Sequence, residues 1–293
     1  MVDVELDISA ADVADFARDG FILRERIISE SVVEMLRAEM AALFERDYQT
    51  GLVPDEVNWR PGDDPSVTRQ ICNGWKARPR LASVVLHRAI GEACARLNGW
   101  PGARIAHDNI LWKPPAGDRP GGALGMHQDS AFIGWSDPSL MCTVWIALDD
   151  TTAAGGAMEF ARGSHLWERR PAIDQFHAPE DYLAEFRAMT AEREAEMVPV
   201  AVPKGGGSIH HGWLWHGSGP NRTDRPRRSV VAHCLSAEAS FTGEVGPVYS
   251  RYKRAGSAEM DEAFFPILWH SKRPPSGFLE GYFNGRLGWP AID

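Results

Sequence analysis

The spacing of apolar residues indicates helices in the first third of the chain. Apolar side chains recur every three to four positions over residues 31–47 and again over residues 81–97, a period typical of amphipathic helices. A further helix is predicted to begin after Ser9, with Asp12 completing its cap, and to end at Gly20. The first hundred residues are therefore expected to form a mainly helical layer.

The pattern then changes to short apolar runs separated by Gly, Pro and Asp turns. A short strand is predicted at residues 21–23, and the region from 103 to 235 is typical of an all-β barrel or sandwich, with apolar runs such as 141–148 and 229–235. An apolar stripe predicts one helix over residues 179–197. The fold class that follows is mainly β with flanking helices.

No repeat, low-complexity tract or linker divides the chain, so one domain over residues 1–293 is predicted. Residues 48–80 are irregular and rich in Gly, Pro, Trp and Arg, as in a loop at an active site, and residues 260–269 are expected to form a short helix or lid. The expected parts are a helical layer with the active-site loop (1–100), a β core (101–240) and a C-terminal lid or extension (241–293).

Composition and charge exclude several classes of function. A net charge of −9 argues against nucleic acid as a partner, because phosphate groups require a basic surface. No signal peptide is evident, and no apolar stretch is long enough to span a membrane. The cysteines are scattered and form no metal-binding or redox pair, which suggests reduced thiols in a cytoplasmic protein; they are Cys72, Cys94, Cys142 and Cys234.

Three residues have the spacing of a metal site. His127 and Asp129 are two positions apart, so on a strand both side chains project to one side, and His216 would complete a 2-His-1-carboxylate set of the kind that holds non-haem Fe(II). Arg227 follows His216 at a distance suited to binding an acidic co-substrate, and Ser218 shares the strand parity of His216. We therefore expect an oxygen-activating enzyme.

The parity of the segment after Pro226 supports one shared cavity. Arg227 should point to the same side as Ser229, Val231 and His233, whereas the alternate residues should face the other side: Arg228, Val230, Ala232 and Cys234.

Other histidines compete for the third ligand position. His210 and His211 lie close to His216 in the chain, and His165 and His177 are further candidates. The Gly-Ser-x-Pro-Asn context after His216 and the downstream Arg227 favour His216, and His210 and His211 are interpreted as structural groups or as orienting partners of the ligands.

At these positions the sequence resembles the phytanoyl-CoA dioxygenase family of Fe(II)/2-oxoglutarate oxygenases. The resemblance extends from Asp19-Gly20-Phe21 to slightly beyond Arg227, with Ala161-Arg162-Gly163 in place of the more usual Pro-Gly. Its signatures, in order, are Lys113-Pro114-Pro115, His127-Gln128-Asp129, Trp145 to Asp150, Gly163-Ser164-His165, and His216-Gly217-Ser218 with Pro220-Asn221 and Arg227.

The resemblance implies a double-stranded β-helix (jelly-roll) fold with Fe(II), 2-oxoglutarate and O2 as cofactors and co-substrates. His127, Asp129 and His216 would bind the iron, and Arg227 and Ser218 would hold 2-oxoglutarate; further contacts would come from Trp145, Asn109 and Gln70. In related halogenases a small residue replaces the carboxylate, so Asp129 favours hydroxylation or a related oxidation with release of succinate and CO2.

A small organic metabolite is the expected substrate, with an acyl-CoA as the alternative within the family. The candidate contacts are Phe132, Trp135, Trp213 and Lys113. The basic run Arg69, Lys76, Arg78 and Arg80 could bind a carboxylate or phosphate, although a solvated loop is favoured. A monomer or homodimer is expected.

Two other functions are compatible with the same residues. One is a zinc-type metal-dependent hydrolase, which would leave Arg227 and Ser218 without a role, and the other is a jelly-roll binding protein without catalysis.

Overall fold

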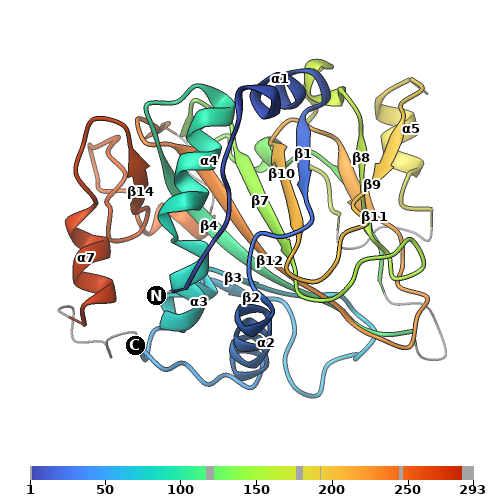
Figure 1. Cartoon of the computed structure of the whole chain (residues 1–293), viewed down its shortest axis with the longest axis horizontal. Coiled ribbons are helices and arrows are strands. Elements are labelled where there is room, and N and C mark those ends of the chain that lie inside the picture. The colour runs from blue at the N-terminus through green and yellow to red at the C-terminus, as the bar shows by residue number, and fades with distance from the viewer. Residues whose placement is uncertain (1, 117–121, 176–180, 192, 244–246, 286–293) are drawn as a thin grey trace.

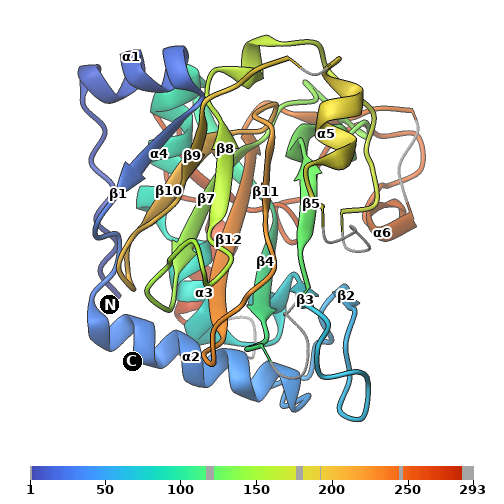
Figure 2. The ribbon, with the colours of Figure 1, turned by 90° about the vertical axis from the view of Figure 1, so that its right-hand side faces the viewer.

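Two antiparallel sheets that face each other form the core of the protein (Figures 1 and 2). The computed structural model describes residues 2–116, 122–175, 181–191, 193–243 and 247–285. Apolar side chains of both sheets meet between them, among them Phe21 and Trp145 from one and Phe160 from the other, which is the packing of a jelly-roll.

The larger sheet has eight strands in the order β1-β10-β7-β12-β4-β3-β2, with β14 also paired to β4. Its strands are β1 (Phe21–Arg24), β2 (Glu56–Val57), β3 (Arg69–Cys72), β4 (Gly102–Lys113), β7 (Cys142–Ala147), β10 (Gly207–His211), β12 (Arg227–Ser236) and β14 (Ile267–His270).

The smaller sheet has the order β5-β11-β8-β9, and a separate pair joins β6 to β13. These strands are β5 (Leu124–His127), β8 (Met158–Ala161), β9 (Met197–Pro199), β11 (His216–Ser218), β6 (Ser136–Asp137) and β13 (Ser240–Phe241).

Helices of the first hundred residues cover the outer face of the larger sheet (Figure 1). The helices are α1 (Ala10–Asp19), α2 (Glu30–Phe44), α3 (Pro79–Val85), α4 (Arg88–Asn98), α5 (Ala184–Met189), α6 (Pro247–Ser250) and α7 (Gly277–Phe283), with short 3-10 turns η1 (Gly74–Lys76), η2 (Asp129–Phe132) and η3 (Ser164–Leu166). None of the helices in the described ranges has the length and apolar character that crossing a membrane requires.

Alternation along β12 separates an apolar outer face from a polar inner face, as the sequence predicts. Val230, Ala232 and Cys234 pack in the outer core against the helices. Arg227 and His233 point instead toward the space between the sheets, where both line a cavity. One strand therefore contributes to the hydrophobic core and to the functional site at once.

The predicted start of α1 is confirmed in detail. The Ser9 hydroxyl accepts the backbone N–H of Asp12, and the Asp12 carboxylate accepts the backbone N–H of Ser9, so both groups are satisfied in a capping box. Gly20 ends the helix in the left-handed conformation at φ 86°, which glycine adopts without the clash that a Cβ would cause.

Two predicted helices have different bounds. The stretch 81–97 is two helices, α3 and α4, because the chain turns at Leu86 and the His87 ring caps α4 by accepting the backbone N–H of Ala89. The helix predicted over 179–197 is reduced to α5: Ala191 has a positive φ of 52°, and the chain pairs as strand β9 from Met197. Residues 176–180 and 192 lie outside the described residues.

The helix expected over residues 260–269 is wrong, because the end of this segment is strand β14. Pro266 has no N–H to donate within a helix, and its carbonyl accepts the backbone N–H of Ile105. The apolar residues that follow extend the larger sheet at β4 and pack on α4, where Leu268 lies against Gly91. The C-terminal segment thus adds a strand to the sheet, as β1, β2 and β3 of the first hundred residues also do.

This contact predicts that Gly91→Ala destabilises the protein. Alanine favours a helix by about 1 kcal/mol over glycine, but the added Cβ would lie 2.6 Å from Leu268 Cβ and 3.1 Å from the backbone nitrogen of Trp269. The clash should outweigh the propensity, with a net loss of about 1–3 kcal/mol in urea unfolding. Gly277→Ala is the control, since a Cβ there meets nothing within 4 Å; equal stability of the two variants would contradict the packing argument.

Candidate active site

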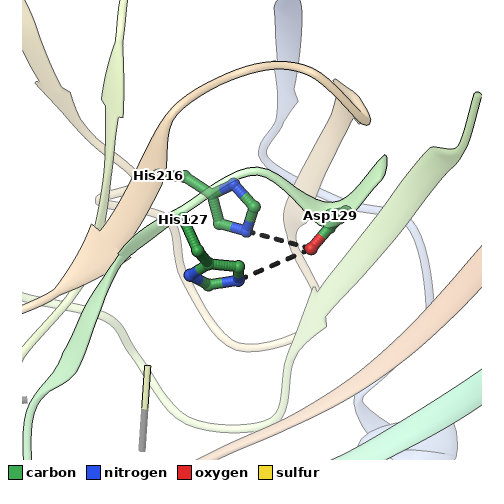
Figure 3. A group of neighbouring side chains, drawn as sticks. All are labelled: His127, Asp129 and His216. Carbon is green, nitrogen blue, oxygen red and sulfur yellow. Dashed lines mark ion pairs between the residues drawn. The ribbon is translucent and has the colours of Figure 1, made fainter. Parts of the chain in front are cut away.

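The three predicted metal ligands meet on the inner face of the smaller sheet (Figure 3). His127 ends β5, and the antiparallel register places it directly opposite His216 of β11. Asp129 begins the 3-10 turn η2, so the chain bends after an extended Gln128 and returns the carboxylate to the two imidazoles. The ligand atoms all lie within 4.8 Å of one another.

Each imidazole presents Nε2 to the centre of the group. His127 Nδ1 donates to the carbonyl of Gly125 at 2.8 Å, and His216 Nδ1 donates to the carbonyl of Leu214 at 3.0 Å. Because a carbonyl can only accept, Nδ1 holds the proton in both rings and Nε2 holds the lone pair. Both Nε2 atoms lie 3.5 Å from Asp129 Oδ1, whereas adjacent ligands of an octahedral ion lie about 3 Å apart.

The second oxygen of Asp129 is held by side chains of the larger sheet. The Thr143 hydroxyl donates to Asp129 Oδ2 at 2.6 Å, and His210 Nε2 lies 3.3 Å from the same oxygen. His233 Nδ1 is 2.9 Å from Thr143 Oγ1. These contacts fix the carboxylate with Oδ1 directed at the two imidazoles, which is how outer partners orient a metal ligand.

The protonation states suit a cation. Burial raises the pKa of the Asp129 carboxyl, but the surrounding imidazoles, His216 first, outweigh it and hold that pKa well below its ordinary value. Burial and then the nearby His127 lower the pKa of His216 well below its ordinary value, and burial lowers the pKa of His233 to about 4. An ionised carboxylate and a neutral imidazole are the forms that bind metals.

The competing histidines occupy other places. His210 is buried beside Asp129 and contacts the carboxylate rather than completing the ligand set. His211 and His165 pack against each other with ring centroids 5.1 Å apart, and His165 Nε2 lies 3.2 Å from the carbonyl of Ala17. His177 lies outside the described residues.

The three candidate ligands line a cavity of about 490 Å³, and the side chain predicted to bind an acidic co-substrate, Arg227, lines it as well. Arg227 lines this cavity although its side chain is only 4% exposed, and its Nε has no hydrogen-bond partner in the described part of the chain. Burial lowers the pKa of Arg227 to about 10, so the guanidinium stays charged at neutral pH. A buried cation with an unpaired donor is suited to binding an anion.

Ser218 lines the same cavity, and Lys113 fixes the orientation of its hydroxyl group. The fully buried Lys113 donates from Nζ to Ser218 Oγ at 2.7 Å and to the carbonyl of Gly219 at 2.6 Å. Since Ser218 accepts this bond, its own proton is available to a ligand in the cavity. Burial, and then the charge of Arg227, lower the pKa of Lys113 well below its ordinary value.

The remaining predicted contacts divide into two groups. Those that line the cavity are Trp145, Asn109, Gln70, Phe132 and Trp135. Lys113 and Trp213 are not among the lining residues. Lys113 supports Ser218, and Trp213 donates from Nε1 to the carbonyl of Ser139 at 3.2 Å.

The basic run of residues 69–80 does not face the cavity. The Arg69 guanidinium is stacked between Trp59 and Trp112, with its Cζ 3.6 and 3.9 Å from the ring centroids. Lys76 pairs with Asp55 at 2.8 Å. These cations hold the loop together, so the favoured interpretation as a solvated loop is wrong for both.

Sequence reasoning placed His233 on the cavity side of its strand, but it gave no place in the site to His107, Thr143 and Tyr249, which also line the cavity. Thr143 lies on β7 directly opposite His233 of β12, so strand parity combined with its polar character could have indicated it as well. Tyr249 comes from the C-terminal segment, and no local pattern connects it to the site.

The family model for phytanoyl-CoA dioxygenase matches residues 16–229, which is most of the chain and includes all three ligands and Arg227. The chain belongs to the phytanoyl-CoA dioxygenase family. Members of this family are non-haem iron- and 2-oxoglutarate-dependent oxygenases, and the protein is an enzyme of this class.

Named proteins that are similar to this chain also belong to the phytanoyl-CoA dioxygenase group. Rat peroxisomal phytanoyl-CoA dioxygenase is 19% identical over 79% of this chain and 69% of its own length. The mouse phytanoyl-CoA dioxygenase domain-containing protein 1 is 24% identical over 65% of this chain and 64% of its own. The chain thus spans about two thirds of these relatives.

Solved structures share the fold over nearly their whole length. The carbocyclase SnoK from nogalamycin biosynthesis is 24% identical, with a TM-score of 0.69 over 91% of this chain and 99% of that one. The epimerase SnoN from the same biosynthesis is 21% identical, with a TM-score of 0.67 over 88% and 97%. Family membership therefore favours the oxygenase over a zinc-type hydrolase and over a binding protein without catalysis.

The geometry predicts that His216→Ala abolishes tight Fe(II) binding and that His211→Ala does not. Loss of an outer partner alone weakens a metal site about 10- to 100-fold, so loss of a ligand should cost more than about 100-fold. Anaerobic calorimetric titration with Fe(II) measures both. Weak binding by the His211 variant together with wild-type binding by the His216 variant would reverse the assignment.

Thr143→Val should weaken Fe(II) binding about 10-fold without removing a ligand, because Asp129 Oδ2 loses its hydroxyl donor and keeps only the longer contact with His210. Thr151→Val is the matched control: its buried hydroxyl donates to the carbonyl of Val200 at 2.7 Å, outside the cavity lining. The same titration applies, and equal affinities of the two variants would show that Thr143 does not orient the ligand.

Proposed function

We propose that this enzyme uses O2 to oxidise a C–H bond of a small organic metabolite, most simply by hydroxylation: one oxygen atom enters the substrate, and the other enters the succinate that forms from 2-oxoglutarate with release of CO2. The observation that carries the proposal is one cavity with three ligand atoms converging on one side and a buried, partly unpaired guanidinium elsewhere in its wall. A metal bound by three groups on one face keeps positions open for a chelating co-substrate and O2.

The donor set fits ferrous iron. His127, Asp129 and His216 would hold it through two neutral imidazole nitrogens and one carboxylate oxygen, each already oriented by a partner. When bound, iron with 2-oxoglutarate supplies the oxidising power that no amino-acid side chain has. The presence of Asp129 supports hydroxylation or a related oxidation over halogenation.

The other groups of the site would bind and orient the co-substrate. Arg227 would pair with its distal carboxylate, for which a planar fork of donors is better suited than an ammonium. Ser218 would donate its hydroxyl proton to the same carboxylate, since its oxygen accepts the hydrogen bond from Lys113 and its proton stays free for a ligand. Trp145 lies beside Arg227, with its ring centroid 5.7 Å from the guanidinium carbon, and would exclude water.

The neighbours support this assignment. A solved structure of SnoN is described in complex with Fe3+, α-ketoglutarate and nogalamycin RO, and one of EvdO2 from Micromonospora carbonacea with 2-oxoglutarate. SnoN is named an α-ketoglutarate-dependent epimerase and SnoK an α-ketoglutarate-dependent carbocyclase, so proteins of this fold differ in the reaction that they catalyse. We propose that residues 1–293 form one catalytic domain, since the larger sheet takes strands from residue 21 to residue 270. A cytoplasmic location stays a prediction.

A visible titration separates the oxygenase from a zinc-type hydrolase. Anaerobic addition of Fe(II) and 2-oxoglutarate to the protein should give a weak charge-transfer band in the visible range, because the co-substrate chelates the iron. A hydrolase with the same ligands would give no such band, and that result would refute the proposal.

Arg227→Gln should raise the KM for 2-oxoglutarate about 10- to 100-fold, because a charge-assisted pair is lost. Arg228→Gln is the control: its side chain projects to the other side of β12 and binds Asp149 at 2.7 and 2.9 Å. Succinate release at varied 2-oxoglutarate measures both. An Arg227 variant that changes the KM for the organic substrate as much as that for 2-oxoglutarate would argue against this role.

A further inference from the structure

The cavity extends from the triad across the strands of the larger sheet, away from Arg227. Four inward side chains stand in register across four strands: His210, Thr143, His233 and His107. Asp129 contacts the first three, whereas His107 lies two strands beyond Thr143, about 10 Å away. Arg227 is six residues from His233, about 20 Å along β12. His107 therefore lies in a different part of the cavity from Arg227.

A chain of hydrogen bonds fixes which atoms face this part. The Thr143 hydroxyl proton goes to the Asp129 carboxylate, which can only accept. His233 Nδ1 must then donate to Thr143 Oγ1 at 2.9 Å, and Nε2 of the neutral ring accepts from Asn109 Nδ2 at 3.1 Å. The chain of bonds from Asp129 through Thr143 and His233 thereby fixes the orientation of the Asn109 amide.

This orientation leaves the Asn109 carbonyl oxygen unused. Oδ1 is buried and has no hydrogen-bond partner among the described residues, and Asn109 lines the cavity. An amide oxygen accepts a proton, so it suits an O–H or N–H of a ligand and repels a carboxylate oxygen. The Asn109 carbonyl oxygen is thus matched to a hydrogen-bond donor of the substrate.

Aromatic rings complete the same part of the cavity. The Tyr249 hydroxyl lies 2.7 Å from His107 Nδ1, and the Tyr249 ring is stacked on Trp135 at 4.3 Å between centroids. Trp135 lines the cavity with a buried Nε1 that has no partner in the described ranges. Flat apolar surface with a few polar atoms favours a ring compound that carries hydroxyl groups.

The charges oppose a polyanionic substrate. Apart from Arg227, the described lining residues include no Lys or Arg, whereas Glu56 and Asp174 are acidic. The phosphate groups of a coenzyme A thioester would find no cation here, and a cavity of about 490 Å³ suits a ligand of drug size. A neutral substrate is favoured over an acyl-CoA.

We propose that the region formed by Asn109, His107, Tyr249 and Trp135 is a subsite for a hydroxylated, uncharged ring compound, with the Asn109 carbonyl accepting the proton of a substrate hydroxyl. This inference rests on the proposed function, because it places the substrate in the cavity that the triad opens on.

Three matched ring compounds and one acyl-CoA test the subsite by anaerobic calorimetry on protein loaded with Fe(II) and 2-oxoglutarate. The probes are β-naphthol, naphthalene, β-naphthoate and lauroyl-CoA. We expect β-naphthol to bind at least about threefold more tightly than naphthalene, the effect of one neutral hydrogen bond, and more tightly than both anions. Equal binding of β-naphthol and naphthalene, or tightest binding of lauroyl-CoA, would overturn the proposal.

Variants locate the effect. Asn109→Leu and Tyr249→Phe should each lower the affinity for β-naphthol about three- to tenfold and leave that for naphthalene unchanged. Tyr48→Phe removes a hydroxyl outside the cavity lining and should change neither. Unaltered preference for β-naphthol in both cavity variants, with wild-type melting temperatures, would refute the assignment.

The two proposals fail separately. The charge-transfer band recorded in the same samples reports iron and 2-oxoglutarate. An intact band without hydroxyl preference refutes the subsite alone. A missing band refutes the oxygenase site, and a retained hydroxyl preference, measured on iron-free protein, would still support the subsite.

Discussion

The pairing of β5 with β11 is the constraint on which the site depends. It places His127 opposite His216 across two antiparallel strands, and the turn η2 returns Asp129 to both Nε2 atoms. Backbone carbonyls hold the two imidazoles in one tautomer. A shift of register by one residue would turn one imidazole to the other face of the sheet, so the geometry of the candidate metal site depends on the hydrogen bonds between β5 and β11.

The larger sheet stabilises the buried carboxylate of Asp129. A buried carboxylate is costly unless it is hydrogen-bonded, and the inward residues Thr143, His210 and His233 surround Asp129. The outward residues of the same strands, such as Val144 and Val230, pack against the helices. Packing of the outward residues therefore fixes the position of the inward polar residues on the same strands. The free energy of this packing offsets the cost of burying the Asp129 carboxylate.

Much of this could be predicted from local pattern. The cap of α1 and the alternation along β12 are near-neighbour properties, which the spacing of residues determines. The approach of Asp129 to His127 depends instead on the turn η2, which strand parity does not predict. The ends of elements were less predictable. Strand β14 forms because it pairs with β4 and packs on α4, and α5 is short because the chain after it pairs with β8 as strand β9. These partners are distant in sequence, and intrinsic propensity is weak against such contacts.

The sequence by itself determined which side chains offer atoms that can bind a metal, and on which side of β12 Arg227 and His233 lie. Only the tertiary structure decided that His210 supports Asp129 instead of competing with His216, that Lys113 stands behind Ser218, and that Tyr249 meets His107. The physical reason is that strand parity is set between adjacent residues, whereas hydrogen-bond partners across sheets are set by how the whole chain packs.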